Sequence, residues 1–303
     1  MCFLVKYKLS ILNILYKHME TINTDINSSI IDNLFIVIIL IVILIIYIFI
    51  YVKYNINSIN SINSINILQS TNIKRYGTEY GGFYYPEGLD LLNKDSIIYS
   101  FGVGLDISHD LMISNQLNSH IYLFDPTIES KYHVDYIKDI LDNKSPILSN
   151  KKYGGGDPNY LDICLENKID TNKIHYYDYG IYKNCDRLKF YKPKNKEYVS
   201  CSLNKKMNNI NINNFYYVYV KDLKTIMYEN NHTNIDLLKI DVEGVECDIV
   251  DYLIDNNIYP IYLSIDFDTI HIDKERVYNS LDKLKKYYHL IHTNGQDYSF
   301  IIK

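Results

Sequence analysis

The stretch SIIYSFGVGLDISHDLMISNQLNSHIYLFDP, residues 96–126, decides the fold class. An apolar run over 96–104 ends in glycines, and a segment with a helical spacing of apolar residues follows over 106–119. A second short apolar run, over 120–126, ends at Asp125 and the proline after it. Two short apolar runs on either side of a helical segment are typical of a strand–helix–strand unit whose strands lie parallel.

The same alternation continues to the end of the chain. Asp106 is expected to cap the first helix, because its carboxylate can accept hydrogen bonds from the free N–H groups there. A turn containing Asn294-Gly295 is expected to join two closing strands into a hairpin. Further strands are expected over 173–182, 235–241 and 260–268, and further helices over 244–256 and 273–288. The sequence therefore predicts an α/β fold with a mostly parallel sheet and an antiparallel C-terminal hairpin.

An uncharged segment precedes this domain. Residues 34–52 contain no charged side chain, and a helix of that length would be about 28 Å long, close to the bilayer's hydrocarbon thickness of about 30 Å. We therefore predict a transmembrane helix over 34–52 that makes the chain a single-pass membrane protein in contact with the lipid bilayer. The other parts are an N-terminal segment (1–33), a low-complexity tether with a repeated Ser-Ile-Asn triplet (53–75) and a folded domain (76–303).

The charges that flank the uncharged segment do not fix its orientation. Three basic residues precede it and three follow it up to residue 75, so the positive-inside rule gives a tie. If translation starts at Met19, the preceding flank is purely acidic, and this alternative favours a cytosolic C-terminal domain.

Composition excludes some functional classes. Residues 76–303 carry 25 of the 31 basic residues and 33 of the 36 acidic ones, a net charge of −8. Such a domain repels phosphate backbones unless it contains a focused basic stripe, so nucleic acid is not an expected partner. The five cysteines are odd in number and widely spaced, which argues for reduced thiols and against a zinc site.

Glycines and an acid follow the first two predicted strands, where open α/β sheets bind ligands. Gly102 and Gly104 allow a tight turn and a close approach of a ligand to the backbone. Asp125 follows at the distance where a carboxylate can take both hydroxyls of a ribose. Ile107 stands where a dinucleotide fingerprint has its third glycine, which disfavours NAD. A nucleoside without a diphosphate, such as S-adenosylmethionine, needs only the glycine turn and the acid.

The segment KIDVEGVE, residues 239–246, places several charges at the end of an apolar strand. Lys239 and Asp241 share a strand face, and burying such charges is costly unless they pair or function. A purely structural alternative is an ion pair of Lys239 and Glu246 with Glu243 at the helix start. Another alternative is a Mg²⁺ site formed by Asp241 with the acids that follow the next strand, Asp266 and Asp268.

The segment from Arg187 to Lys206 contains seven basic residues and one acidic residue. We expect a solvated loop here, and the alternative is a docking site for an acidic substrate.

Five segments of the chain together resemble the FkbM-type methyltransferase family. The resemblance covers about residues 77–303. It implies a class I, Rossmann-like, S-adenosylmethionine-dependent methyltransferase that usually acts on a hydroxyl oxygen. Leu105 and Val245 depart from the usual family pattern, which often has an acid and an alanine there. The segments are YSFGVGLDISHD (99–110), IYLFDPT (121–127), YGIYKNCDRLKFYKPKNKEYVSCS (179–202), IDLLKIDVEGVE (235–246) and IDFD (265–268).

The prediction is therefore a membrane-anchored methyltransferase with a small-molecule or glycan-like hydroxylated acceptor. Gly102, Gly104 and Asp125 are expected to bind the cofactor, and Asp241 with Glu243 to act as catalytic base or orienting acid. A metal is not expected. The main alternative is a membrane-tethered binding or scaffold protein that keeps the fold without catalysis, and an NAD-linked oxidoreductase is a third.

Overall fold

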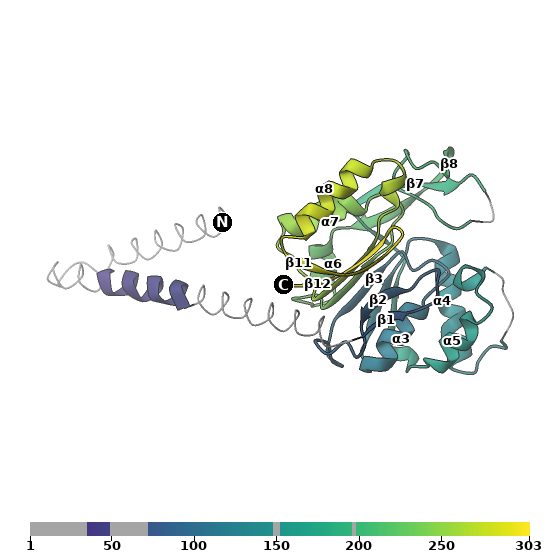
Figure 1. Ribbon diagram of the computed structural model, residues 1–303, viewed down its shortest axis with the longest axis horizontal. Helices are drawn as coiled ribbons and strands as arrows, with labels where there is room; N and C mark the ends of the chain where they lie inside the picture. The colour runs from purple at the N-terminus through teal and green to yellow at the C-terminus, as the bar shows by residue number, and fades with distance from the viewer. Residues whose placement is uncertain (1–34, 49–71, 148–151, 196–197) are drawn as a thin grey trace, which may run out of the picture. The chain divides into compact units, whose positions relative to one another are not determined.

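The computed structural model describes residues 35–48, 72–147, 152–195 and 198–303. A seven-stranded sheet forms the centre of its folded domain (Figure 1). The strand order is β11-β12-β10-β9-β3-β4-β5. Strands from β5 to β10 pair in parallel, whereas β12 is antiparallel to both β10 and β11. The predicted α/β fold, with its mostly parallel sheet and C-terminal hairpin, is therefore confirmed. The strands are β3 (Ile98–Phe101), β4 (Ile121–Phe124), β5 (Ile174–Tyr177), β9 (Leu237–Ile240), β10 (Tyr262–Asp266), β11 (Tyr288–Asn294) and β12 (Asp297–Ile302).

Helices cover both faces of this sheet and give it two apolar cores. One core joins α3, α4 and α5 to one sheet face, and the other joins α6, α7 and α8 to the opposite face. Alternation along β3 shows the division, since Ile98 belongs to the first core and Tyr99 to the second. The helices are α3 (Ser108–Leu117), α4 (Ile128–Leu141), α5 (Tyr160–Glu166), α6 (Leu223–Glu229), α7 (Glu246–Asp255) and α8 (Lys274–Leu284), with short 3₁₀ turns η1 (Tyr153–Gly156), η2 (Thr171–Lys173) and η3 (Asp268–His271).

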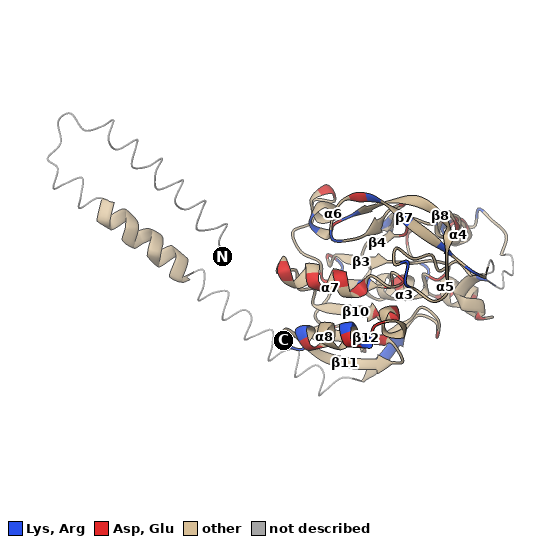
Figure 2. Cartoon of the chain, turned by 90° about the horizontal axis from the view of Figure 1, so that it is seen from above, with Lys and Arg blue, Asp and Glu red and all other residues tan. Residues whose placement is uncertain are grey.

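Ion pairs join the last two helices. Helix α7 is rich in acidic residues, and α8 carries both signs of charge (Figure 2). Arg276 and Lys283 of α8 contact the two carboxylate oxygens of Asp251 on α7 at 2.5 and 2.6 Å. These pairs are partly exposed, so they orient the helices more than they stabilise them.

The start of α3 differs from the prediction. Its N-cap is Ile107, which makes no side-chain capping bond. Asp106 instead accepts hydrogen bonds from the backbone N–H and hydroxyl of Ser108, at 2.8 and 2.6 Å, and from the hydroxyl of Thr78. Asp106 therefore lies one residue before the N-cap position, but its carboxylate does bind a free N–H of the first turn, that of Ser108.

Two smaller sheets flank the central one. β1 (Ile73–Tyr76) and β2 (Phe83–Pro86) form a hairpin, and its first strand begins three residues before the predicted boundary at residue 76. β6 (Gly180–Ile181), β8 (Ile210–Lys221) and β7 (Asp186–Pro193) form a three-stranded sheet in the order β6-β8-β7. The solvated loop predicted from Arg187 to Lys206 is therefore wrong for the residues that lie in β7, because they form a strand paired with β8.

The chain divides into two units, Met1–Ser58 and Ile59–Lys303, and the second contains all three sheets. The first unit is described here by itself. The described part of the first unit is a helix over residues 35–48, whose apolar side chains are largely exposed. Within the described residues, no helix has both the length and the apolar character needed to cross a membrane. The transmembrane helix predicted over 34–52 is thus not supported, although residues 34 and 49–52 lie outside the described part. The predicted segment 1–33 and most of the tether also lie outside it.

Candidate functional site

A cleft opens at the carboxyl ends of β3, β4 and β9, where the strand order reverses between β3 and β9. This is the position where open α/β sheets bind ligands. The cleft encloses about 820 Å³, with open solvent at its mouth included. All five predicted site residues line it together: Gly102, Gly104, Asp125, Asp241 and Glu243.

The two glycines of this cleft serve different purposes. Both have a positive φ, +75° at Gly102 and +49° at Gly104, a conformation that costs a side chain energy. A Cβ on Gly102 would lie 1.6 Å from the backbone oxygen of Asp241, so this glycine lets β3 and β9 approach each other. A Cβ on Gly104 would meet no atom within 4 Å. Gly104 is therefore the position that leaves the backbone open to a ligand.

Asp125 is buried at the wall of the cleft and is already well bonded. Its Oδ1 accepts from the backbone N–H and hydroxyl of Thr127 at 2.8 and 2.6 Å, and its Oδ2 accepts from the N–H of Gly104 at 2.9 Å. Burial raises the pKa of Asp125, although these hydrogen bonds and Lys239 lower it. A carboxylate has about four acceptor positions, and these three bonds leave about one position of Asp125 open to a further donor.

Lys239 lies beneath the cleft and pairs with Asp241. The lysine side chain is 1% exposed, and its Nζ lies 3.7 Å from Oδ2 of Asp241, which is 27% exposed. Glu246, the other partner considered for Lys239, instead accepts from the N–H of Gly244 and from the hydroxyl of Thr269. The alternative prediction of an ion pair between Lys239 and Glu246 is therefore wrong, because Asp241 rather than Glu246 faces the buried ammonium.

Burial and neighbouring charges raise the pKa of both predicted catalytic acids. Burial contributes most to the raised pKa of Asp241; Lys239 opposes this effect and Asp268 adds to it. Burial followed by Asp268 raises the pKa of Glu243. Glu243 also has a φ of +58°, which is uncommon for a residue with a side chain and is found at functional sites. The turn is held by Asn204, whose amide donates to the oxygen of Gly244 at 2.8 Å.

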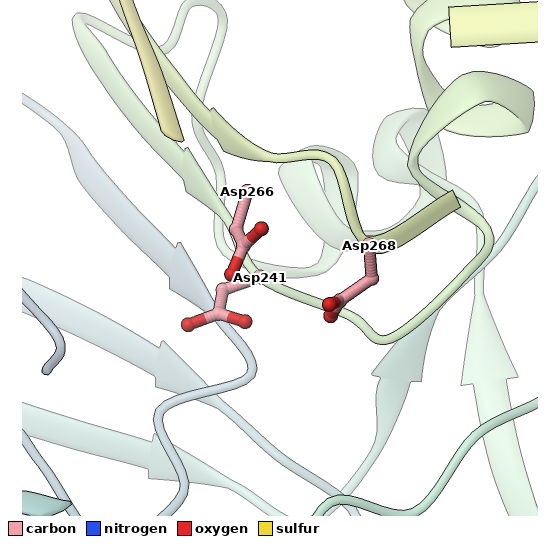
Figure 3. A group of neighbouring side chains, drawn as sticks. All are labelled: Asp241, Asp266 and Asp268. Carbon is pink, nitrogen blue, oxygen red and sulfur yellow. The ribbon is translucent and has the colours of Figure 1, made fainter. Parts of the chain in front are cut away.

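Three carboxyl groups converge beside the cleft. One oxygen each of Asp241, Asp266 and Asp268 lies within 4.8 Å of the others (Figure 3). They come from the ends of β9 and β10 and from η3, as the sequence predicted for these strand ends. Asp268 accepts from the Gln296 amide at 2.7 Å, whereas the buried Oδ1 of Asp266 has no hydrogen-bond partner within the described part of the chain. Hard oxygen donors at this spacing fit a divalent cation such as Mg²⁺.

Tyr80, which no sequence motif singled out, also lines the cleft. It lies between β1 and β2, and a Cβ on Gly155 would be 2.3 Å from its ring, so the η1 turn packs directly against it. Tyr80 is 60% exposed overall, but local desolvation where it lines the cleft, followed by the charges of Asp241 and Glu243, raises its pKa to about 12. Its hydroxyl therefore keeps its proton and can donate a hydrogen bond. The glycine pair that follows it, Gly81-Gly82, was the only local signal of a tight turn here.

The remaining wall comes from the three-stranded sheet. Phe190 of β7 and Val218 and Val220 of β8 present an apolar surface to the cleft. The cleft thus has an apolar side, where a flat ring can pack, and an acidic end at Asp241 and Glu243. This division into apolar walls and a few polar groups is typical of a small-molecule site.

The chain matches no protein-family model, no curated protein and no solved structure. The resemblance to the FkbM-type family accordingly stays a prediction from the motifs.

Proposed function

We propose that this chain is an S-adenosylmethionine-dependent methyltransferase of class I, Rossmann-like architecture that acts on a hydroxyl group of a small-molecule or glycan-like acceptor. The observation that carries the proposal is the cleft where the strand order reverses. It brings together an open glycine turn, an acid placed to bind a ribose, and two half-buried acids with raised pKa values. Perturbed carboxyl groups in a cleft are candidates for proton transfer.

The residues present fit such a cofactor. The backbone at Gly104 has free space beside it for a ligand. Asp125 has one acceptor position left for a ribose hydroxyl. Ile181 and Val220 form an apolar wall against which an adenine base can pack. Ile107, which is buried, occupies the position where a dinucleotide-binding turn has its third glycine. The turn therefore lacks the glycine that allows close approach of a pyrophosphate. These features favour a nucleoside without a diphosphate over NAD.

In the proposed reaction, S-adenosylmethionine supplies an electrophilic methyl group on its sulfonium. Transfer of that methyl group to the acceptor oxygen would require the hydroxyl proton to leave. Asp241 accepts that proton, because its raised pKa makes it a stronger base than an ordinary aspartate. Lys239 fixes the position of this carboxylate. Glu243, whose pKa is also raised, keeps its proton at neutral pH and orients the acceptor as a hydrogen-bond donor.

The test is a calorimetric titration of the full chain with S-adenosylmethionine and S-adenosylhomocysteine. We expect micromolar binding that Asp125→Ala weakens by roughly 10- to 100-fold, because a hydrogen bond to a charged group contributes about 1.5–3 kcal/mol. Asp162→Ala, on the exposed side of α5, is the matched control and should bind like the wild type. Asp241→Asn should also bind like the wild type, because its role is in proton transfer.

Two outcomes of this titration would change the proposal. If the folded wild-type chain binds neither compound, the methyltransferase proposal fails and a scaffold protein becomes the better reading. If Asp241→Asn abolishes binding, Asp241 belongs to the cofactor site and is not the base. Cofactor binding without methyl transfer to any hydroxylated acceptor would favour a non-catalytic binding protein.

We expect this reaction to proceed without a metal, because Lys239 already neutralises Asp241. Mg²⁺ in excess should then shift the unfolding temperature of the wild type no more than that of Asp266→Asn, and EDTA should leave cofactor binding unchanged. A larger shift for the wild type would instead assign the three-aspartate cluster to Mg²⁺, and Asp241 would act as a ligand.

We also propose that residues 34–52 attach the protein to a membrane. The segment is uncharged, and its described helix exposes Leu40 and Leu44 among other apolar side chains. Full-length protein should therefore stay in the membrane fraction after alkaline carbonate extraction, whereas Leu40→Lys with Leu44→Lys should release it. Release of the wild type under the same treatment would contradict membrane attachment.

A further inference from the structure

The long hairpin formed by β7 and β8 has one face that the cleft does not use. Side chains alternate along both strands, so Phe190, Val218 and Val220 point to the cleft. The opposite face, called here the outer face, is formed by directly paired residues of the two strands: Arg187 with Tyr219, Lys189 with Tyr217, and Tyr191 with Phe215.

The outer face combines aromatic rings with cations. The Arg187 guanidinium lies 5.3 Å from the ring centre of Tyr217 and 5.9 Å from that of Tyr219, and Nζ of Lys189 lies 4.1 Å from that of Phe215. Within the described residues, neither cation forms an ion pair. None of the six residues is acidic, although residues 76–303 have a net charge of −8.

The rings of this face are exposed, although Phe215 makes edge contacts with Tyr191 and Tyr217. Phe215, Tyr217 and Tyr219 have exposed fractions of 37%, 49% and 65%, whereas Val218 and Val220 between and after them are buried. The fold is stabilised by the buried side of the hairpin, so the row of exposed rings is free to contact another surface.

We propose that the outer face binds the surface of a bilayer that contains anionic lipids. Tyrosine rings are amphipathic and favour the interface between headgroups and hydrocarbon. Unpaired Arg187 and Lys189 attract anionic headgroups, and each cation near such a surface strengthens binding about fivefold. Two cations on an acidic domain are too few for a phosphate backbone, whose binding depends on many such contacts.

The chain contains no tryptophan, so a single introduced tryptophan reports on one site of the full-length protein. Tyr217→Trp places it on the outer face, and Tyr228→Trp places it on α6, at another strongly exposed tyrosine, as the matched control. Each protein is mixed with phosphatidylcholine vesicles that contain a brominated lipid quencher, with and without phosphatidylserine.

We expect phosphatidylserine to increase quenching at position 217 and to leave position 228 unchanged. High salt should reverse the increase. At a fixed phosphatidylserine content, adding Arg187→Gln and Lys189→Gln should raise the lipid concentration needed for half-maximal quenching by about 30-fold. Quenching that is independent of phosphatidylserine, or equal at both positions, would overturn the proposal. A spectral change at position 217 with a single-stranded oligonucleotide but not with vesicles would also overturn it, in favour of nucleic acid.

Discussion

Gly102→Ala is expected to cost about 4 kcal/mol or more of the free energy of unfolding. The added Cβ would lie 1.6 Å from the backbone oxygen of Asp241 and 2.7 Å from its carbonyl carbon. Both strand ends are fixed in place, because the N–H of Gly102 donates to Phe124 and the N–H of Asp241 donates to Phe101. Relief of the overlap therefore requires β3 and β9 to move apart at the centre of the sheet.

Gly104→Ala is the matched control for this substitution. It introduces the same methyl group at a positive φ but meets no atom within 4 Å, so only the backbone cost of about 1–2 kcal/mol is expected. Urea denaturation of both variants and the wild type measures the difference. Failure of Gly102→Ala to fold, beside a folded Gly104→Ala, would be the same result in a stronger form. Equal losses for the two variants would contradict the close approach of the strands.

The contrast between these glycines also shows how far the sequence could predict the site. Each of the five predicted residues lies within three residues after an apolar strand, and parallel strands bring their carboxyl ends to one edge. Their proximity therefore followed from chain order alone. The role of Gly102 did not, because the GxG pattern carries no information about the neighbouring strand that approaches it.

Other parts of the fold differed in how far the sequence could predict them. Tyr80 reaches the cleft because the Gly155 turn packs against its ring, a pairing that no local pattern encodes. Helix α4, in contrast, had a readable signal in the cap at Thr127 and the helical spacing of buried Val134, Ile137 and Leu141. The outer strands β7 and β8 are rich in lysine, asparagine and tyrosine, so their alternation between faces was hard to distinguish from a polar loop.

Lys239→Met is expected to cost up to about 3–5 kcal/mol at pH 8, because it removes a buried cation and leaves its half-buried acid partner unpaired. Lys239 is 1% exposed and lies 3.7 Å from Asp241. Burial lowers the pKa of Lys239, but Asp241, Asp110 and Asp106 together raise it above its ordinary value. A lysine whose pKa is raised on folding contributes its stabilisation throughout the neutral range and loses it only at high pH.

The loss should be smaller at pH 5 than at pH 8. Without Lys239, Asp241 loses the charge that lowers its pKa, which is already raised by burial. A carboxyl group whose pKa is raised in the folded state holds a proton that the unfolded chain releases, so the free energy of unfolding falls as the pH rises. At pH 5 protonation of Asp241 compensates for the missing cation, whereas at pH 8 the charge is left unpaired. The comparison is made by urea denaturation in EDTA, so that no divalent cation replaces the lysine.

Lys221→Met supplies the control for charge loss as such. Lys221 forms a partly exposed pair with Glu229 at 2.6 Å, and such pairs contribute about 0–1 kcal/mol. Combining Lys239→Met with Asp241→Asn should recover part of the stability at pH 8, since no unpaired charge then remains from the pair. If Lys239→Met costs no more than Lys221→Met, or costs the same at both pH values, the buried pair does not hold Asp241 in its charged form. The proposed base would then lack the group that positions it.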